Sequence, residues 1–167
     1  MGNDMASTQA VAAFRKPRAL DTIVWGGLAA GVFDSVDAII AFGLLKGMNP
    51  IQILQFIASG LLGPDSFKGG LATAALGAGL HFFIAFVAAG AYYAASLKLP
   101  ALYRQATTWG LTFGVAVYIF MNYLVLPLSA VPKSPISLAL FLNGVIGHAV
   151  FVGFPIAWFA RRSTTKN

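Results

Sequence analysis

Four long apolar segments dominate this sequence, near residues 23–45, 71–97, 108–131 and 136–160. A helix rises 1.5 Å per residue, so about 20 apolar residues cross the hydrocarbon core of a bilayer. A helix also satisfies its own backbone hydrogen bonds where no water is available. None of the segments alternates between apolar and polar residues as a half-buried strand does. The sequence therefore predicts an all-α integral membrane bundle of about four transmembrane helices.

The composition points to the same class of protein. Of the 167 residues, 58% are hydrophobic and 10% are charged, whereas a soluble domain has about 45–50% apolar and 25% charged residues. The chain has no cysteine, which excludes disulfides and thiolate metal sites. Its net charge is +6, but the basic residues lie at the ends of the apolar segments and not on one face, so we expect no nucleic-acid partner.

The basic residues also predict the topology, because cytoplasmic loops of membrane proteins are enriched in Lys and Arg. Eight of them precede the first segment, separate the second from the third or follow the fourth: Arg15, Lys16, Arg18, Lys98, Arg104, Arg161, Arg162 and Lys166. Lys46, Lys68 and Lys133 fall on the opposite side. We therefore expect a single transmembrane domain over residues 20–162, with cytoplasmic tails at 1–19 and 163–167.

A short helix is expected between the first two transmembrane segments, over residues 50–62. Asn49-Pro50 offers an N-cap followed by proline in the first turn, and Gly63-Pro64 offers a stop. About 13 residues are too few to span the bilayer. This helix is therefore expected to lie at the interface or to re-enter the bundle, where it could serve as a connector or as a lid.

Polar side chains interrupt all four apolar segments. Asp34, His81, Asn122 and His148 lie near the middle of their segments, and Asp37 follows Asp34 by nearly one helical turn. An ionisable residue at mid-bilayer costs about 2.5–3.5 kcal/mol, so such residues normally face the bundle interior and have a partner or a function. We expect these five side chains to form a polar network inside the membrane.

Small residues at helical spacing support that convergence. Gly27 and Gly31 share a face with Asp34, Gly77 lies one turn before His81, and Gly144 lies one turn before His148. Small residues let membrane helices approach closely, so these glycines are predicted to pack against neighbouring helices.

Three interpretations of the network remain open. It could be structural, with Asp34 accepting hydrogen bonds from His81 or His148 and Asn122 bridging. It could handle or sense protons or ions, because chains of Asp and His mark relays in membrane transporters. It could also hold haem or a divalent metal, with His81, His148 and Asp34 as candidate ligands. No cofactor is predicted outright.

An enzyme is the less expected class, because no nucleophile-base pair, phosphate loop or cofactor fingerprint is present. The expected partners are the lipid bilayer and other membrane helices, including those of a homo-oligomer, since four helices are few for enclosing a transport path.

Three motifs in the second to fourth segments occur in a recognisable order. They are His81 with Val87, Ala89 and Tyr92; Gly110-Leu111, Gly114, Phe120 and Pro127-Leu128; and Gly147-His148 with Val150 and Arg161-Arg162. In this order and spacing the chain resembles the YagU-like family of small bacterial inner-membrane proteins. The resemblance implies a multi-pass protein of the bacterial inner (plasma) membrane and suggests that His81 and His148 occupy family positions. It supplies no established reaction.

Overall fold

The computed structural model describes residues 15–133, 135 and 137–164, and this part of the chain contains helices and no strands. Four helices are long and apolar enough to cross a membrane: Leu20–Lys46, Gly70–Lys98, Ala106–Leu128 and Leu138–Ser163. Large apolar side chains cover their outer faces, as Leu44 shows with an exposed fraction of 81%. The prediction of an all-α membrane bundle is confirmed.

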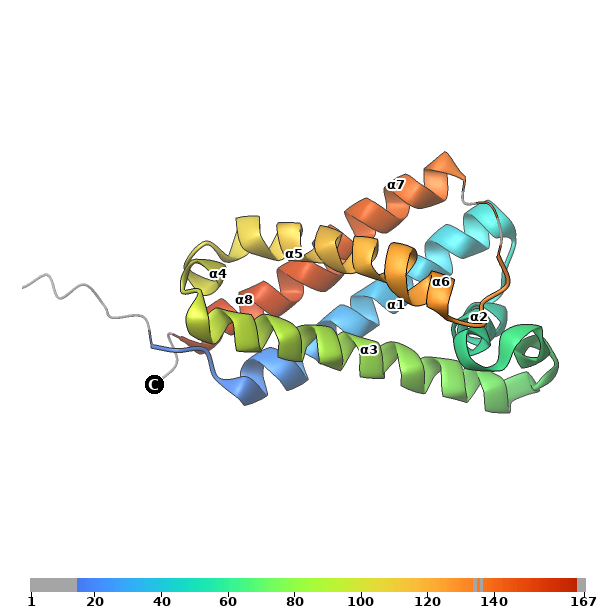
Figure 1. Ribbon diagram of the computed structural model, residues 1–167, viewed down its shortest axis with the longest axis horizontal. Coiled ribbons are helices and arrows are strands. Elements are labelled where there is room, and N and C mark those ends of the chain that lie inside the picture. Colours follow the sequence, from blue (N-terminus) through green and yellow to red (C-terminus); the bar gives the residue numbers. More distant parts are fainter. Residues whose placement is uncertain (1–14, 134, 136, 165–167) are drawn as a thin grey trace, which may run out of the picture.

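The elements follow one another in the order η1 (Leu20–Gly26), α1 (Gly27–Lys46), α2 (Pro50–Leu62), η2 (Gly63–Lys68), α3 (Gly70–Lys98), α4 (Ala101–Arg104), α5 (Ala106–Phe120), η3 (Met121–Val125), α6 (Leu126–Leu128), α7 (Leu138–Gly147), η4 (His148–Gly153) and α8 (Phe154–Ser163). Here η1, η3 and η4 are π-helical turns within longer helices, and η2 is a 3-10 helix. The first span is thus η1 with α1, the third is α5 with η3 and α6, and the fourth is α7 with η4 and α8 (Figure 1).

Two prolines explain two of the π-helical turns. Pro127 and Pro155 each follow such a turn, η3 and η4 respectively, by two residues. Proline cannot donate to the carbonyl four residues earlier, and its ring crowds that carbonyl, so the preceding turn widens. The third span then ends at Leu128, three residues before the predicted boundary. The fourth begins at Leu138, where the Ser137 hydroxyl accepts a hydrogen bond of 3.3 Å from the Leu140 amide.

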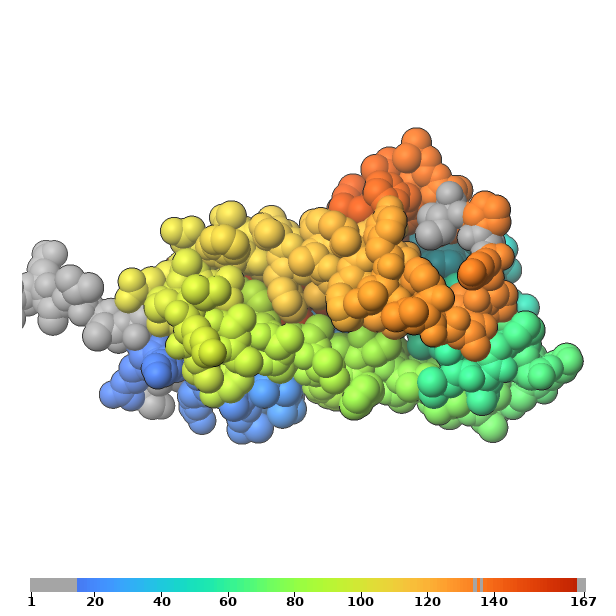
Figure 2. Space-filling view, in the orientation of Figure 1, coloured from blue at the N-terminus to red at the C-terminus, as the bar shows by residue number. Residues whose placement is uncertain are grey.

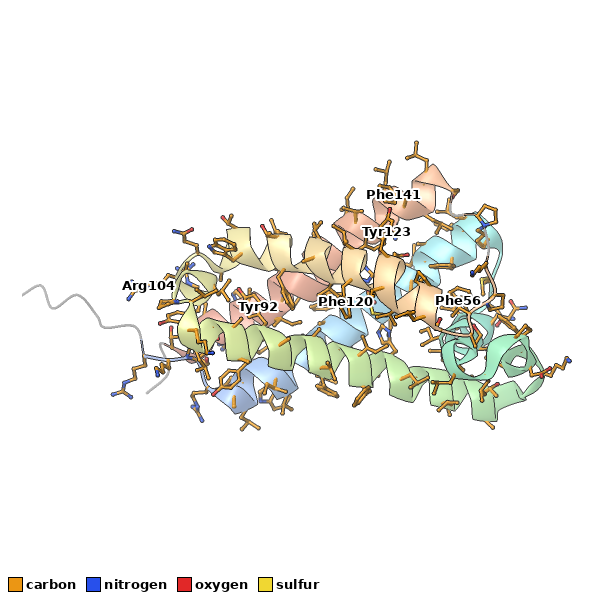
Figure 3. All side chains as sticks on the ribbon, in the orientation of Figure 1. Phe56, Tyr92, Arg104, Phe120, Tyr123 and Phe141 are labelled. Atoms are coloured by element: carbon orange, nitrogen blue, oxygen red, sulfur yellow. The ribbon has the colours of Figure 1, made fainter. Side chains whose placement is uncertain are left out.

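Both ends of the described chain lie at the same end of the bundle (Figure 1). The Arg18 amide donates a hydrogen bond of 2.9 Å to the Ser163 hydroxyl and so joins the start of the first span to the end of the fourth. The buried core lies at this end and contains Ala30, Ala89, Tyr92, Leu102, Ala106, Val152, Ile156, Ala157 and Ala160. Tyr92, labelled in Figure 3, donates through its hydroxyl to the Leu102 carbonyl at 2.7 Å.

The opposite end of the bundle is more open. There α7 diverges from the other spans, in the ribbon and in the space-filling view alike (Figures 1 and 2). The spans are therefore tightly packed near the termini and spread apart at the far end.

Helix α2 closes part of that far end. Its Asn49 cap forms a reciprocal pair of 3.0 Å hydrogen bonds with Gln52, and Pro50 begins the helix, as the sequence predicted. The helix packs on the first turns of α3, where the Gln55 amide donates to the Gly70 carbonyl at 3.0 Å. Gln55 and Ser59 of α2 are therefore buried in the protein, together with the apolar Ile53 and Ala58, whereas Gln52 in the first turn is exposed.

Candidate functional site

A large cavity occupies the middle of the bundle and extends towards the end opposite the termini. Its volume is about 960 Å³. Residues of all four spans line it, together with α2 and the connection between α6 and α7. Two residues of the buried core, Ala30 and Val152, line its end nearer the termini. The cavity thus arises because the spans pack closely at one end and separate at the other.

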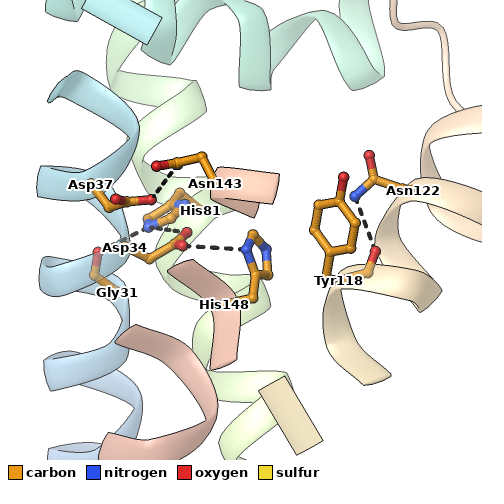
Figure 4. Close-up of polar contacts among 8 residues, drawn as sticks. All are labelled: Gly31, Asp34, Asp37, His81, Tyr118, Asn122, Asn143 and His148. Atoms are coloured by element: carbon orange, nitrogen blue, oxygen red, sulfur yellow. Dashed lines mark hydrogen bonds and ion pairs between the residues drawn. The ribbon is translucent and has the colours of Figure 1, made fainter. Parts of the chain in front are cut away.

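Asp34 lies at the cavity wall between two imidazoles from different spans (Figure 4). Its Oδ2 is 3.9 Å from Nε2 of His81 on α3, and its Oδ1 is 3.7 Å from Nδ1 of His148 at the start of η4. The side chains are only 17%, 14% and 23% exposed, respectively. One carboxylate therefore bridges two histidines that are 67 residues apart in the sequence.

His81 also has a backbone partner. Its Nε2 lies 2.9 Å from the Gly31 carbonyl oxygen, and because that oxygen can only accept, this ring nitrogen is the donor. The ring packs edge-on against the ring of Phe82. The Phe82 ring in turn occupies the space that a side chain at Gly31 would fill. Gly31 thus places α1 and α3 close enough for the histidine of one to reach the backbone of the other.

Asp37 has a different partner from Asp34. Its Oδ2 accepts a hydrogen bond of 2.9 Å from Asn143 Nδ2 on α7 (Figure 4). The same oxygen lies against Gly147, where a Cβ atom would come within 2.6 Å of it. The glycine therefore leaves the space in which the carboxylate meets the amide, and α1 and α7 are joined by a hydrogen bond within the membrane.

Asn122 lines the cavity but does not bridge the acid and the histidines. Its Nδ2 donates at 3.0 Å to the Tyr118 carbonyl, one turn earlier in its own helix. The contact between this span and the cluster is instead made by the Tyr118 ring, which packs edge-on against the His148 ring at 5.4 Å between centroids. The bridging role that the sequence suggested for Asn122 belongs to Asp34.

The four glycines predicted to pack all lie against a neighbouring element. A side chain at Gly27 would meet Phe86, one at Gly77 would meet the Leu54 backbone in α2, and one at Gly144 would meet the Tyr118 ring. Gly31 has been described above. Each of these glycines therefore allows a closer approach than alanine would.

The structure adds residues around the site whose contacts the sequence argument missed. Asn143 gave a signal, because it is an amide inside an apolar run only five residues before His148. Gly114 and Gly153 bring the backbones of α5 and η4 into direct contact, and a Cβ at either would overlap the backbone of the other span. The Gly110 and Gly114 pair had the spacing of a close-packing motif, which was a usable signal.

Charge is distributed unevenly along the cavity. Asp34 and Asp37 line its middle, and the basic residues that line it are Lys46 and Lys133. Both lysines are exposed and belong to the end opposite the termini. Lys46 follows Asp37 by nine residues on α1, which corresponds to about 13 Å along the helix axis. The cavity is therefore acidic in its interior and basic at its mouth.

The cluster combines a carboxylate with two imidazoles beside a cavity wide enough for water. As a metal centre it is poorly built. Within the described part of the chain, no three His, Cys, Asp or Glu side chains lie close enough together to hold a metal ion. Comparisons with known proteins identify no relative: no family model, curated protein or solved structure matches the chain.

Proposed function

We propose that this small membrane protein binds and releases protons at the Asp34, His81 and His148 cluster. The observation that carries the proposal is the position of one carboxylate within 4 Å of two imidazoles at the wall of an intramembrane cavity. Imidazole is the side chain that changes charge between about pH 5 and 8 without special tuning. A protonated imidazole in turn stabilises the ionised form of the neighbouring carboxylate.

The distances favour proton binding over a purely structural role. A hydrogen bond between a ring nitrogen and a carboxylate oxygen requires about 2.7–3.2 Å, and both contacts of Asp34 are longer. Coulomb attraction falls only with the inverse of distance, so it still acts strongly at 3.7–3.9 Å when an imidazole is protonated. The cluster is therefore arranged for an electrostatic interaction that depends on protonation, whereas Asp37 and Asn143 make an ordinary hydrogen bond.

The shape of the cavity supports exchange with one side of the membrane. The spans diverge at the end opposite the termini, and the buried core around Tyr92 and Ile156 occupies the other end. Protons would thus reach the cluster from the open end. Passage across the whole membrane would require the core to separate.

The orientation and the membrane belong to the same proposal. The basic residues at the end that carries the termini, among them Arg18 and Arg104, favour that end for the cytoplasm. The cavity would then open away from the cytoplasm. On the residues given above for the YagU-like resemblance, we place the protein in the bacterial inner membrane. Pairing with a second copy would shield the lipid-facing side of the divergent α7.

Titration of the two histidines tests the proposal directly. The chain has only two histidines, so the protein labelled with ¹⁵N-histidine gives two imidazole signals, which His81→Gln assigns. In micelles, both signals are recorded from about pH 5 to 8, where an imidazole changes charge without special tuning. Asp34→Asn removes a negative charge about 4 Å from each ring, worth about 1 kcal/mol even in water, so the protonated-to-neutral ratio at a given pH should fall about fivefold or more.

Asp65→Asn is the matched control, because Asp65 is an 81% exposed acid in η2 outside the cavity. The same chemical change there should leave both titration curves unchanged. Tyr118, Asp37 and Lys46 also line the cavity around the cluster, and all three stay in place in both variants. Curves that are identical in the wild type and Asp34→Asn would reduce the cluster to a structural role.

A further inference from the structure

We infer that the cavity binds an organic cation with an apolar body, whose charged group lies against Asp34 and Asp37. This goes beyond proton binding, because it requires the negative charge of the two carboxylates and a cavity of suitable size, with His81 and His148 of the same lining in their neutral form. The inference joins three independent features of the cavity: its volume, the sign of the charge in its interior and the chemistry of its walls.

The volume is far larger than proton exchange needs. Small-molecule sites in proteins usually enclose about 300–1,000 Å³, and this cavity has about 960 Å³. A narrow file of water would be enough to carry protons to Asp34. The space is therefore that of a site for a molecule with many non-hydrogen atoms.

The charge of the interior selects a cation. Asp34 and Asp37 project into the cavity from the same face of α1, and the lining contains no Arg in the described part of the chain. The lysines of the lining are both at the exposed mouth, where water and salt screen them. An anion would have to leave the lysines and meet two carboxylates in the interior, whereas a cation finds its partners there.

The walls suit an apolar body that carries the cation. Phe42 and Phe56 lie with ring centroids 6.1 Å apart, and Phe67 and Tyr118 also line the cavity. Aromatic faces attract cations within about 6 Å and provide large apolar contact areas. Met48 and Met121 add flexible, polarisable side chains that adapt to irregular ligands. A small inorganic ion would leave most of this surface without a contact.

Binding of two probes of like shape and opposite charge tests the inference. The purified full chain in an uncharged detergent is dialysed against tetraphenylphosphonium or tetraphenylborate. Dialysis of protein-free micelles gives the amount of each probe that partitions into the detergent alone. Tetraphenylphosphonium should bind saturably at one site per chain, and tetraphenylborate should not. Asp34→Asn and Asp37→Asn should each weaken tetraphenylphosphonium binding about tenfold or more, because each removes one negative charge from the interior.

Asp65→Asn should bind tetraphenylphosphonium as tightly as the wild type. At low salt, Lys46→Gln should bind it more tightly than the wild type, since the change removes a repulsive charge at the mouth, and this difference should shrink at high salt. Equal binding of the two probes, or unchanged binding in both Asp34→Asn and Asp37→Asn, would overturn the inference. Because the histidine titration needs no added cation, either proposal can fail while the other stands.

Discussion

The contact between α5 and η4 allows a test of whether close backbone packing stabilises the bundle around the site. At Gly114 the backbones of the third and fourth spans meet without a side chain between them. Adding a single methyl group with Gly114→Ala should destabilise the protein, because the new atom would fall on the backbone of His148 and Ala149. Backbone cannot rotate out of the way as the end of a flexible side chain can.

The size of the effect follows from the distances. The added Cβ would lie 2.6 Å from Ala149 Cα, whereas non-bonded carbons prefer about 3.5–4.0 Å. The two spans must therefore separate by about 1 Å, and a gap of that size forfeits about a quarter to a half of the dispersion attraction at the contact. Overpacking of this kind usually costs about 1–3 kcal/mol in the free energy of unfolding.

Gly79→Ala is the matched control for this change. Gly79 lies in the first half of α3, with no atom within 4 Å of the position of an added Cβ. Alanine favours helix by up to about 1 kcal/mol over glycine, so this variant should be as stable as the wild type or slightly more stable. Unfolding by SDS, followed by tryptophan fluorescence and circular dichroism, measures both variants.

The same substitution should reach the candidate site. His148 begins the segment that Gly114→Ala displaces, so its imidazole signal should change more than that of His81, which belongs to α3. If Gly114→Ala unfolds at the same SDS concentration as Gly79→Ala, the close approach of α5 and η4 is not what holds the third and fourth spans together.

Two further predictions concern the Asp37 contact and the topology. A double-mutant cycle between Asp37→Ala and Asn143→Ala should give a coupling of about 0.6 kcal/mol and at most about 1.7, the range measured for hydrogen bonds between membrane helices; no coupling would contradict the 2.9 Å bond between them. Because the chain has no cysteine, single introduced cysteines report which side of the membrane a residue lies on. A maleimide that cannot cross the inner membrane, added from its outer face, should label Asp65→Cys but not Gln105→Cys. The reverse pattern would contradict the proposed orientation.

The helical spacing of the polar residues predicted which side chains of the first two spans share a face at the site. Gly27, Gly31, Asp34 and Asp37 recur every three or four residues on the first span, so they share one face of a regular helix. His81 and Gly77 do the same on the second. In the structure the first span approaches α3 at Gly31, and Asp34 lies beside His81, whereas Gly77 packs against α2.

The same reasoning failed where the helices are irregular. The π-helical turns before Pro127 and Pro155 contain an extra residue per turn, so a regular helical wheel drawn through them places the following residues on the wrong face. Asn122 lies in one such turn and His148 opens the other. Asn122 donates to the Tyr118 carbonyl one turn earlier in its own helix, so it does not form the expected bridge. Asp34 and His148 were expected to meet, and the packing of the first and fourth spans sets their separation of 3.7 Å.

Hydropathy and helix length determined, without tertiary structure, that the chain is a bundle of four membrane helices with a capped short helix after the first. Both are local properties, because they depend on transfer of side chains to lipid and on hydrogen bonds between residues near in sequence. Only the tertiary structure decided that the spans separate at one end, leaving a cavity with Asp34 at its wall and Gln55 of α2 bonded to α3. Those features depend on contacts between glycines and side chains of different helices, so the sequence of a single segment does not specify them.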